Sequence, residues 1–335
     1  MRSAIFEAAG QPLAITERPI PRPSAGQALI RVCRCGICAS DLAMTAGSPF
    51  DMAAGTAPGH EYSGEVVEAD ADSGLKPGDR VTALPMASCG HCAACRAGAP
   101  LHCAQFVSMA GGYSEYALID SRASFRLPDA LSFEDGALVE PLASSLRGIN
   151  ALDIRPDSRV AVFGAGAIGA GAIFWLGRRG AGRIAAIARS CRSAELVGTM
   201  GASGLVTTGD TMASEVAEML GGPPDIVIDA AGASGILQQA VDLVGWNGTI
   251  LSLGGCMKPD PIIPFFGMIK EVTIRFSVAY GRYEFRHVLD TLEAGHLEPR
   301  AMIGDTIGLA DLPARFEEMR SGSHPAKVMV DPTRG

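Results

Sequence analysis

Four cysteines stand close together in one stretch of the chain, at Cys89, Cys92, Cys95 and Cys103. Four thiolates at such separations can close a tetrahedral zinc site that leaves no ligand position for water. A closed site is structural, so residues 85–105 are expected to form a small lobe held together by the metal. An iron–sulfur cluster is the rival chemistry, but the spacing differs from the ferredoxin patterns. His91 and His102 are expected to take no part.

A second set of potential ligands lies outside this lobe. Cys38 follows a strand-like segment, and His60 and Glu61 stand together at the entry to another. Each has a simpler explanation alone, as a buried thiol and as a polar pair at a strand end. Together they indicate an open zinc site of mixed ligands, with one position left for a substrate. Cys33 and Cys35 are interpreted as core thiols.

A glycine-rich segment, Gly164-Ala-Gly-Ala-Ile-Gly169, follows an apolar strand and opens a helical stretch. In this context the glycines allow a tight turn, close approach of the backbone to a pyrophosphate, and close packing of helix on strand. The backbone N–H groups at the start of the helix, including those of Gly166, Ala167 and Ile168, then face the phosphates. A glycine-rich turn in some other α/β protein is the alternative.

The second strand of this region ends without a carboxylate. Enzymes that use NAD usually carry Asp or Glu there, on the ribose hydroxyls, whereas this chain has Ala188, Arg189, Ser190 and Arg192. Guanidinium and hydroxyl groups suit a ribose 2′-phosphate, so NADP(H) is expected in preference to NAD(H). The alternative is that both arginines are simply solvated. Leu253, at the end of the fourth strand, is also expected at the cofactor.

The elements that must position these groups follow two different patterns. The first part of the chain has short alternating apolar runs rich in Pro and Gly, typical of a mostly β domain. From about residue 159, apolar strands alternate with helical stretches, the rhythm of a doubly wound parallel α/β sheet. Strands are expected at 159–163, 183–187, 225–229 and 248–253, with helices at 193–200 and 213–220. Later helices at 287–294 and 313–319 precede a last strand at 327–330, which is expected to return to the first domain.

Composition limits the classes of protein that need considering. The 335 residues have room for two domains, and 47% of them are apolar, enough for a sizeable core. A net charge of -8 with no basic run argues against a nucleic-acid partner. The start of the chain lacks the order of a signal peptide, and residues 161–177 fit a strand, turn and helix better than a membrane span, so a cytoplasmic protein is expected. Nine cysteines then fit metal ligands and free thiols better than disulfides.

These motifs together resemble the zinc-dependent medium-chain dehydrogenase/reductase family over essentially the whole chain. The resemblance rests on GHEYSGEV at 59–66, KPGDRV at 76–81, the four-cysteine lobe and the glycine-rich segment. Glu140-Pro-Leu142 resembles the sorbitol and threonine dehydrogenase branch, in which Glu replaces a cysteine of the alcohol dehydrogenases. The resemblance implies a GroES-like catalytic domain, residues 1–148 and 278–335, and a Rossmann cofactor domain, residues 149–277.

The resemblance also implies roles for single residues and two zinc ions per chain. Cys38 and His60 are expected as ligands of a catalytic zinc, Glu61 as a ligand or one that exchanges with water, and Glu140 as a ligand directly or through water. Ser40 corresponds to the hydroxyl that passes on the substrate's proton, and Asp41 to a carboxylate that orients His60. A histidine often found five residues after the zinc cysteine is Ala43 here, which leaves the final proton acceptor unassigned.

The activity implied is hydride transfer between NADP(H) and a secondary alcohol, polyol, ketone or aldehyde. Glu140 favours polyols, ketoses or vicinal hydroxy compounds, whereas four loop residues favour a more apolar pocket: Phe50, Met52, Phe106 and Met109. A homodimer or homotetramer is implied, with the sheet edge near 276–280 as a candidate interface and no membrane partner. A zinc-free enone or quinone reductase of the same fold, or a non-catalytic cofactor-binding protein, are the alternatives.

Overall fold

The computed structural model describes residues 1–47, 52–322 and 326–334, and it divides into two compact units. Unit 1 comprises residues 1–143 and 279–335, and unit 2 residues 144–278. The first boundary falls inside helix α3 (Phe133–Ile149), five residues before the end of the first domain as the sequence suggested it. One continuous helix crosses from unit 1 to unit 2. The boundary suggested by the sequence pattern therefore lies a few residues after the boundary between the two packed units.

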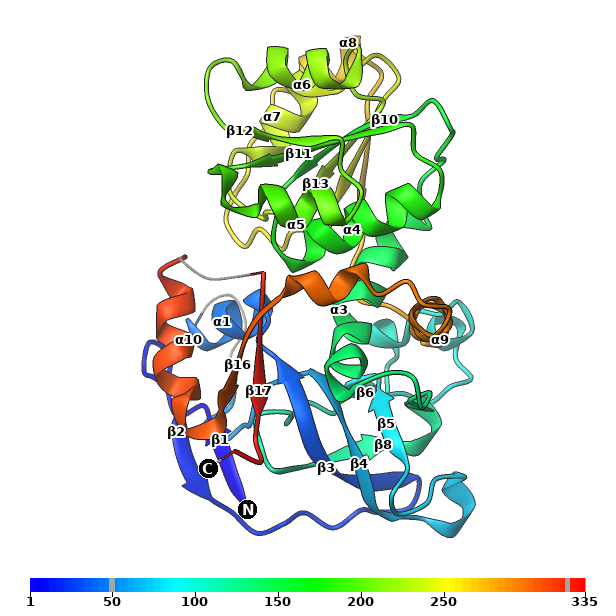
Figure 1. The fold of residues 1–335 in the computed structure, drawn as a ribbon, viewed down its shortest axis with the longest axis vertical. Coiled ribbons are helices and arrows are strands. Elements are labelled where there is room, and N and C mark those ends of the chain that lie inside the picture. The colour runs from blue at the N-terminus through cyan, green and yellow to red at the C-terminus, as the bar shows by residue number, and fades with distance from the viewer. Residues whose placement is uncertain (48–51, 323–325, 335) are drawn as a thin grey trace. The chain divides into compact units, whose positions relative to one another are not determined.

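Unit 1 is built on a seven-stranded sheet in the order β16-β17-β3-β4-β5-β9, with β8 also paired to β3 (Figure 1). Its strands are β3 (Gln27–Gly36), β4 (Glu61–Ala69), β5 (Arg80–Ala83), β8 (Tyr116–Asp120), β9 (Ser124–Arg126), β16 (Ile303–Gly308) and β17 (Lys327–Asp331). The last strand pairs antiparallel with β3, Met329 opposite Gly36. The C-terminal segment therefore returns to the first part of the chain, as expected.

Smaller elements complete unit 1. A two-stranded sheet joins β1 (Arg2–Ile5) and β2 (Ala14–Glu17), and another joins β6 (Met86–Ala87) and β7 (Val107–Ser108). The α-helices are α1 (Ala39–Thr45), α2 (Ala93–Arg96), α9 (Arg282–Glu293) and α10 (Leu312–Arg320). The 3₁₀ turns are η1 (Ala71–Ser73), η2 (Pro100–His102), η3 (Ser121–Ala123), η5 (Glu298–Met302) and η6 (Leu309–Asp311). One core cluster joins the sheet to α10, with Ile30, Val330 and Phe316 all inaccessible to solvent.

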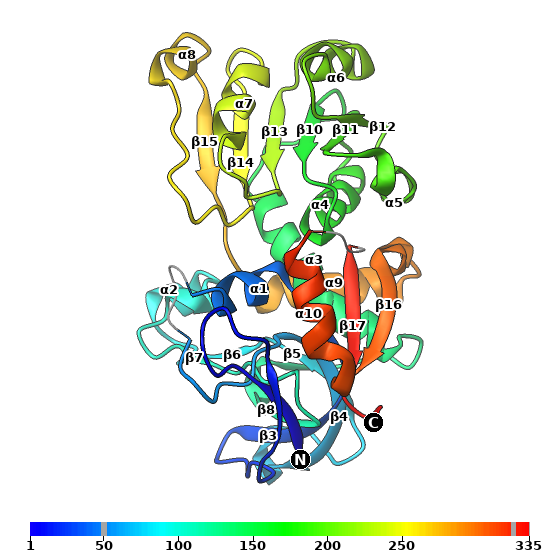
Figure 2. The ribbon, with the colours of Figure 1, turned by 90° about the vertical axis from the view of Figure 1, so that its left-hand side faces the viewer.

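Unit 2 is a six-stranded sheet in the order β12-β11-β10-β13-β14-β15, in which every neighbouring pair is parallel. The strands are β10 (Arg159–Phe163), β11 (Arg183–Ala188), β12 (Gly204–Thr207), β13 (Ile226–Asp229), β14 (Thr249–Ser252) and β15 (Thr273–Phe276). The helices are α4 (Ala167–Arg178), η4 (Cys191–Ser193), α5 (Ala194–Thr199), α6 (Met212–Leu220), α7 (Ile236–Leu243) and α8 (Pro264–Ile269). Figure 2 shows the strands in this order, and Figure 1 shows α6 and α7 on one face of the sheet and α4 and α5 on the other.

This architecture confirms the expected fold class, a doubly wound parallel sheet joined to a mostly β domain. The four strands anticipated in unit 2 are β10, β11, β13 and β14, and they form the middle of its sheet. Two further strands, β12 and β15, were not among the strands anticipated, although the sheet edge expected near 276–280 overlaps the end of β15. None of the helices in the described part of the chain is long and apolar enough to cross a membrane.

Candidate metal centres and cofactor site

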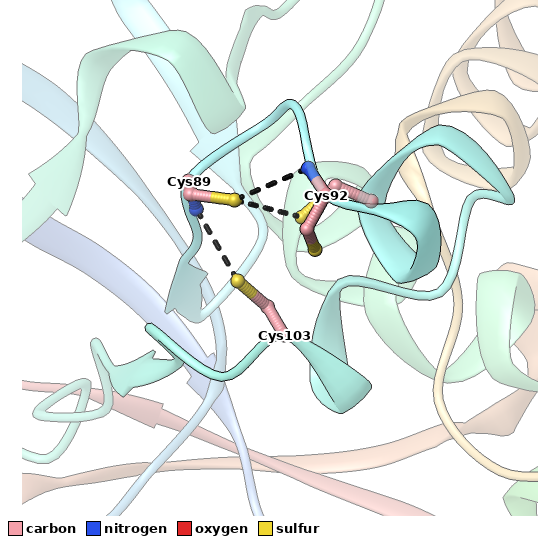
Figure 3. A group of neighbouring side chains, drawn as sticks. Cys89, Cys92 and Cys103 are labelled. Carbon is pink, nitrogen blue, oxygen red and sulfur yellow. Dashed lines mark hydrogen bonds between the residues drawn. The ribbon is translucent and has the colours of Figure 1, made fainter.

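The four lobe cysteines meet on short elements between β6 and β7, and Figure 3 shows three of them, Cys89, Cys92 and Cys103. Cys92 is the N-cap of α2, Cys95 lies within that helix, and Cys103 ends the turn η2. All four sulfur atoms lie within 4.8 Å of one another, and those of Cys89 and Cys95 are 3.9 Å apart. Two sulfur ligands of a tetrahedral zinc ion, each about 2.3 Å from the metal, are about 3.8 Å apart. The group therefore fits one zinc ion.

Backbone N–H groups point at these sulfur atoms. The N–H of Cys92 lies 3.4 Å from the sulfur of Cys89, and the N–H of Gln105 lies 3.3 Å from that of Cys103. Donation from the N–H groups of His91 and Cys92 lowers the pKa of the Cys89 thiol to about 6. Metals bind thiolates and not thiols, so the loop favours the ligand form. The His91 ring donates to the Cys89 carbonyl oxygen, 2.9 Å away, and not to a sulfur.

The second ligand group forms where β3 ends and β4 begins. Cys38 is the N-cap of α1, directly after β3, and Glu61 is the first residue of β4, opposite Gly36 in the register. One ligand atom each from Cys38, His60 and Glu61 lies within 4.8 Å of the other two. A side chain at Gly36 would place its Cβ 2.1 Å from a Glu61 carboxylate oxygen. A glycine is therefore required there for Glu61 to point along the strand towards the group.

A buried carboxylate fixes the orientation of the His60 ring. Asp41 Oδ1 lies 3.1 Å from His60 Nδ1, while Asp41 Oδ2 accepts the Tyr113 hydroxyl at 2.5 Å. Burial lowers the pKa of His60, but the charges of Asp41 and Cys38 outweigh this effect and raise it well above its usual value. Metal binding displaces the proton on Nε2, and with Nδ1–H donated to Asp41 it is the Nε2 lone pair that would then bind the metal.

Ser40 lies on the first turn of α1 beside both ligands. Its hydroxyl oxygen is 3.1 Å from the Cys38 sulfur and 3.4 Å from His60 Nε2. A hydroxyl both donates and accepts a hydrogen bond, so Ser40 can pass a proton at the point where a substrate oxygen would approach the ligands. Ala43, two residues after Asp41, has no group that could continue the relay.

Glu61 is held by a lysine from the far end of the sequence. Lys327, on β17, places its ammonium nitrogen 2.7 Å and 2.6 Å from the two carboxylate oxygens and 3.1 Å from the carbonyl oxygen of Ile37. Both side chains are buried, at 2% exposure for Lys327 and 1% for Glu61. An ion pair in such a site depends on its geometry, because each charge alone would be strongly destabilising. Glu61 thus has a salt-bridge partner as well as a place near the metal ligands.

Glu140 lies on α3 beside this group. The three-residue ligand group does not include it, so its carboxylate is not within 4.8 Å of all three other ligand atoms in the described structure. Burial, reinforced by the negative charge of Glu61 and opposed by His60, raises the pKa of Glu140 to about 7. The Tyr280 hydroxyl donates a hydrogen bond to it. This position suits a contact with a metal through water better than a direct bond.

The glycine-rich segment forms the turn between β10 and α4 in unit 2. Gly164 has φ of 98°, a conformation that favours glycine, and an added Cβ would lie 2.9 Å from the backbone of Ala230. At Gly169, on the first turn of α4, an added Cβ would lie 1.8 Å from the Gly164 carbonyl oxygen. A Cβ on Gly166 would meet nothing within 4 Å. The turn and the packing therefore need glycine at two positions, while the third leaves open space at the helix start.

The other cofactor candidates also lie at the carboxyl ends of the unit 2 strands, where ligands bind in open α/β sheets. Ala188 is the last residue of β11, and Arg189, Ser190 and Arg192 follow it with exposed side chains. Leu253 follows β14, and its N–H donates to the carbonyl oxygen of Asp229 at 2.8 Å. The strands β11, β10, β13 and β14 are consecutive in one parallel sheet. The positions that follow them therefore lie at the same end of that sheet.

Comparison with known proteins adds to this geometry. Residues 24–129 match the alcohol dehydrogenase GroES-like domain family, and residues 167–294 match the zinc-binding dehydrogenase family. Over 327 residues, the chain is 32% identical to the (R,R)-butanediol dehydrogenase of Bacillus subtilis strain 168, covering 93% of this chain and 94% of that protein. The chain belongs to the zinc-dependent medium-chain dehydrogenase/reductase family.

Two solved structures of this family differ in their cofactor. An alcohol dehydrogenase (rspB) from Escherichia coli CFT073, in complex with NADH, matches with a TM-score of 0.88 and 28% identity. A zinc-binding dehydrogenase from Sinorhizobium meliloti 1021, bound to NADP, matches with a TM-score of 0.87 and 29% identity. Each match covers 99% of both chains. This medium-chain dehydrogenase is accordingly an oxidoreductase of the zinc-type alcohol dehydrogenase kind, and these two structures contain different nicotinamide cofactors.

The structure adds three residues to the site that sequence reasoning did not assign: Tyr113, Tyr280 and Lys327. Of the four loop residues considered for an apolar pocket, Phe50 lies outside the described residues. Met109 is buried, with 6% exposure, and Met52 packs against the core of unit 1. These two therefore belong to the packing of the domain, and neither carries an argument about the substrate.

Proposed function

We propose that this dehydrogenase uses a zinc ion held by Cys38 and His60 to exchange hydride between a secondary alcohol or its ketone and NADP(H). The observation that carries the proposal is the convergence of Cys38, His60 and Glu61 within 4.8 Å of one another, with the Ser40 hydroxyl 3.1 Å and 3.4 Å from the first two. A second zinc ion, bound by the four cysteines of the lobe, is proposed as structural.

Each of the surrounding residues has a separate role in the proposed reaction. When bound, the zinc supplies a Lewis acid for the substrate oxygen. Asp41 holds His60 in the tautomer that leaves Nε2 free, and Lys327 holds the Glu61 carboxylate beside the site through a buried salt bridge. Ser40 takes the proton of the alcohol during oxidation and returns it during reduction. The N–H groups at the start of α4 bind the pyrophosphate of the cofactor.

We propose a substrate with a hydroxyl or carbonyl group next to the reacting carbon. The Bacillus relative is a butanediol dehydrogenase, and the product of oxidising one hydroxyl of such a diol is a hydroxyketone. Glu140 supports this class, because a buried carboxyl whose pKa lies near 7 can accept or donate a hydrogen bond at neutral pH. A neighbouring hydroxyl is a natural partner for such a group.

For the cofactor, we propose a preference for NADPH. Arg189 and Arg192 follow β11 with exposed side chains, and no carboxylate stands between Ile187 and Ser193. A guanidinium that binds a phosphate contributes about 1.5–3 kcal/mol, or roughly a 10- to 100-fold change in affinity. We expect turnover of hydroxyketones and ketones with NADPH, and an Arg189→Ala change that weakens NADPH binding at least about tenfold while leaving NADH unchanged. Reduced-cofactor consumption with both nucleotides over a panel of ketones, ketoses, aldehydes and enones measures this.

Arg183→Ala is the matched control for this experiment, because Arg183 is an exposed arginine at the opposite end of the same strand. Equal use of NADH by the native enzyme, or equal losses in both variants, would mean that Arg189 is a solvated bystander. Turnover confined to enones and insensitive to zinc removal would favour the zinc-free reductase instead.

We also propose a homodimer joined through the outer edge of β15. This strand ends the unit 2 sheet, so one row of its backbone groups has no partner strand in the described structure. Around it lie large exposed apolar side chains, including Trp246 at 74% exposure and Phe276 at 70%. An exposed apolar edge strand is avoided in monomers. A second copy is the proposed occupant, because the same edge pairs with itself about a two-fold axis.

A Phe276→Glu change is expected to convert the dimer into monomers at micromolar concentration, because two buried carboxylates would face each other across the axis. Light scattering after gel filtration measures the mass. Tyr283→Glu, at an equally exposed aromatic residue of unit 1, is the control and should leave the mass unchanged. A native protein that is already monomeric would exclude the interface.

A further inference from the structure

Unit 1 contains a cavity of about 230 Å³ that is lined by Cys95 of the cysteine lobe but by none of the residues of the proposed catalytic centre. It lies beside the cysteine lobe, between α2, the β8–β9 connection and the start of α9. Its apolar wall comes from Leu84, Met86 and Pro100, and its rim carries the ring of Tyr283, which is 63% exposed. The volume is below the roughly 300–1,000 Å³ of pockets for drug-sized ligands, so a small molecule is the appropriate size of occupant.

The charged residues that line this cavity are mostly positive. Three arginines and one carboxylate take part: Arg96, Arg122, Arg282 and Asp120. Arg122 is already used, since its guanidinium pairs with Asp120 at 2.9 Å and donates to the Ser88 carbonyl oxygen at 3.2 Å. Within the described residues, Arg96 and Arg282 have no ion-pair partner. Two guanidinium groups thus remain unneutralised at one cavity.

Arg282 is also held in a fixed position. Its guanidinium carbon lies 4.8 Å from the ring centre of Phe125, and Arg286 stacks on the same ring at 5.2 Å. Burial lowers the pKa of Arg282, the charge of Asp120 opposes this effect, and the charge of Arg286 adds to it. Stacking on an aromatic ring fixes a guanidinium so that its N–H groups remain available for a planar or tetrahedral anion. An anion in the cavity would offset the repulsion between the two arginines.

Neutralising the metal-binding thiolates is the other purpose these arginines could serve. Hydrogen bonds to those sulfur atoms come from backbone N–H groups of Cys89, Cys92 and Gln105, and from the Ser88 side chain to Cys95. Arg122 donates to Asp120 and Ser88, and neither Arg96 nor Arg282 donates to a sulfur. The thiolates are therefore satisfied without the arginines, which leaves the cavity charge available for a ligand.

We propose that this cavity binds a small organic phosphate, with the phosphate group between Arg96 and Arg282 and an apolar group against Leu84, Met86 and Tyr283. A phosphate monoester carries roughly two negative charges at neutral pH, which matches the two unpaired guanidinium groups. The apolar wall favours an organic ester over the inorganic ion. The cavity adjoins the proposed structural zinc centre through Cys95, whereas no residue of the proposed catalytic centre and no cofactor position of unit 2 lines it.

Calorimetric titration of the zinc-loaded protein with phenyl phosphate tests the proposal, with inorganic phosphate as the probe for the head group alone. We expect one saturable site, tighter for phenyl phosphate, and at least about tenfold weaker binding in Arg96→Met and in Arg282→Met, as for other lost charged hydrogen bonds. Arg286→Met is the matched control, because Arg286 stacks on the same ring without lining the cavity. It should change the affinity less than about twofold.

Other outcomes overturn the proposal. Absence of saturable binding, or equal affinity in all variants, excludes the site. Loss of phenyl phosphate binding in Arg189→Ala would assign the anion to the cofactor positions. Loss of zinc from Arg96→Met or Arg282→Met, measured by elemental analysis, would mean that these arginines serve to neutralise the thiolates.

Discussion

Replacing Cys38 by alanine is expected to remove one of two zinc ions per chain and to lower kcat/KM on the order of a thousandfold. The reason is that a Lewis acid at the substrate oxygen supplies several kcal/mol of transition-state stabilisation, and about 4 kcal/mol corresponds to three powers of ten in rate. Cofactor affinity should change little, since the proposed nucleotide-binding positions all lie in unit 2. Elemental analysis, steady-state kinetics and direct titration of NADPH measure the three effects.

Two cysteine substitutions provide the comparison for this experiment. Cys33→Ala removes a buried thiol of β3 that belongs to neither ligand group, and it should keep both zinc ions and most of the activity. Cys103→Ala removes a ligand of the lobe, so it should cost the other zinc ion and lower stability rather than abolish turnover directly. Full turnover by Cys38→Ala with both metals retained would rule out the proposed catalytic centre.

The parts of this site that could be predicted share one property: their signals are local. The four lobe cysteines were recognised because their spacing along the chain is itself the chemical pattern, and Cys38 and His60 because the short motifs around them resemble those of the dehydrogenase family. The strand β10 was predicted residue by residue for a similar reason. It is a continuous apolar run buried on both faces, followed at once by a glycine-rich turn. Local patterns of this kind can be recognised without knowledge of the fold.

The strands that were missed lie at the two edges of the unit 2 sheet. In β15 the residues Thr273, Arg275 and Phe276 are exposed, and in β12 only Val206 is buried. Edge strands bury less apolar surface, so the run of buried residues that identifies a central strand is absent. The first turn of α9 was missed because its residues Arg282 and Tyr283 are exposed, and the helix was expected to begin only at His287.

The partner of Glu61 could not be predicted, because no local pattern connects residues that lie 266 positions apart. Lys327 precedes the apolar segment Val328-Met-Val330, which by itself indicates a strand with a charged residue at its exposed end. The pairing of β17 with β3 brings this lysine instead into the interior, under the first residue of β4. Only the register of three strands, which the sequence does not display, makes the contact.

The buried ion pair of Lys327 and Glu61 leads to a second prediction, a large loss of stability when one partner is removed. Replacing Lys327 by methionine should lower the free energy of unfolding of the zinc-free protein by about 3–5 kcal/mol, because the Glu61 carboxylate would remain buried without its partner. The double change Lys327→Met with Glu61→Gln should recover most of this loss, since no uncompensated charge is left. Both tryptophans, Trp175 and Trp246, lie in unit 2, so fluorescence would not report it. Hydrogen exchange of β3, β4 and β17 is the appropriate measurement.

Comparison of the zinc-loaded with the zinc-free protein distinguishes two roles of Glu61: it pairs with Lys327, and it lies beside the proposed metal ligands. Without Lys327 the carboxylate still lies within 4.8 Å of the Cys38 and His60 ligand atoms, so a bound cation gives it a second partner and the destabilisation should shrink. Lys327→Met should then release its catalytic zinc to a chelator more slowly than the native enzyme does. Arg315→Met, which breaks a half-exposed pair with Asp305 in the same unit, is the control and should cost no more than about 1 kcal/mol. Equal losses with and without zinc would mean that Glu61 only neutralises Lys327 and has no part in holding the metal.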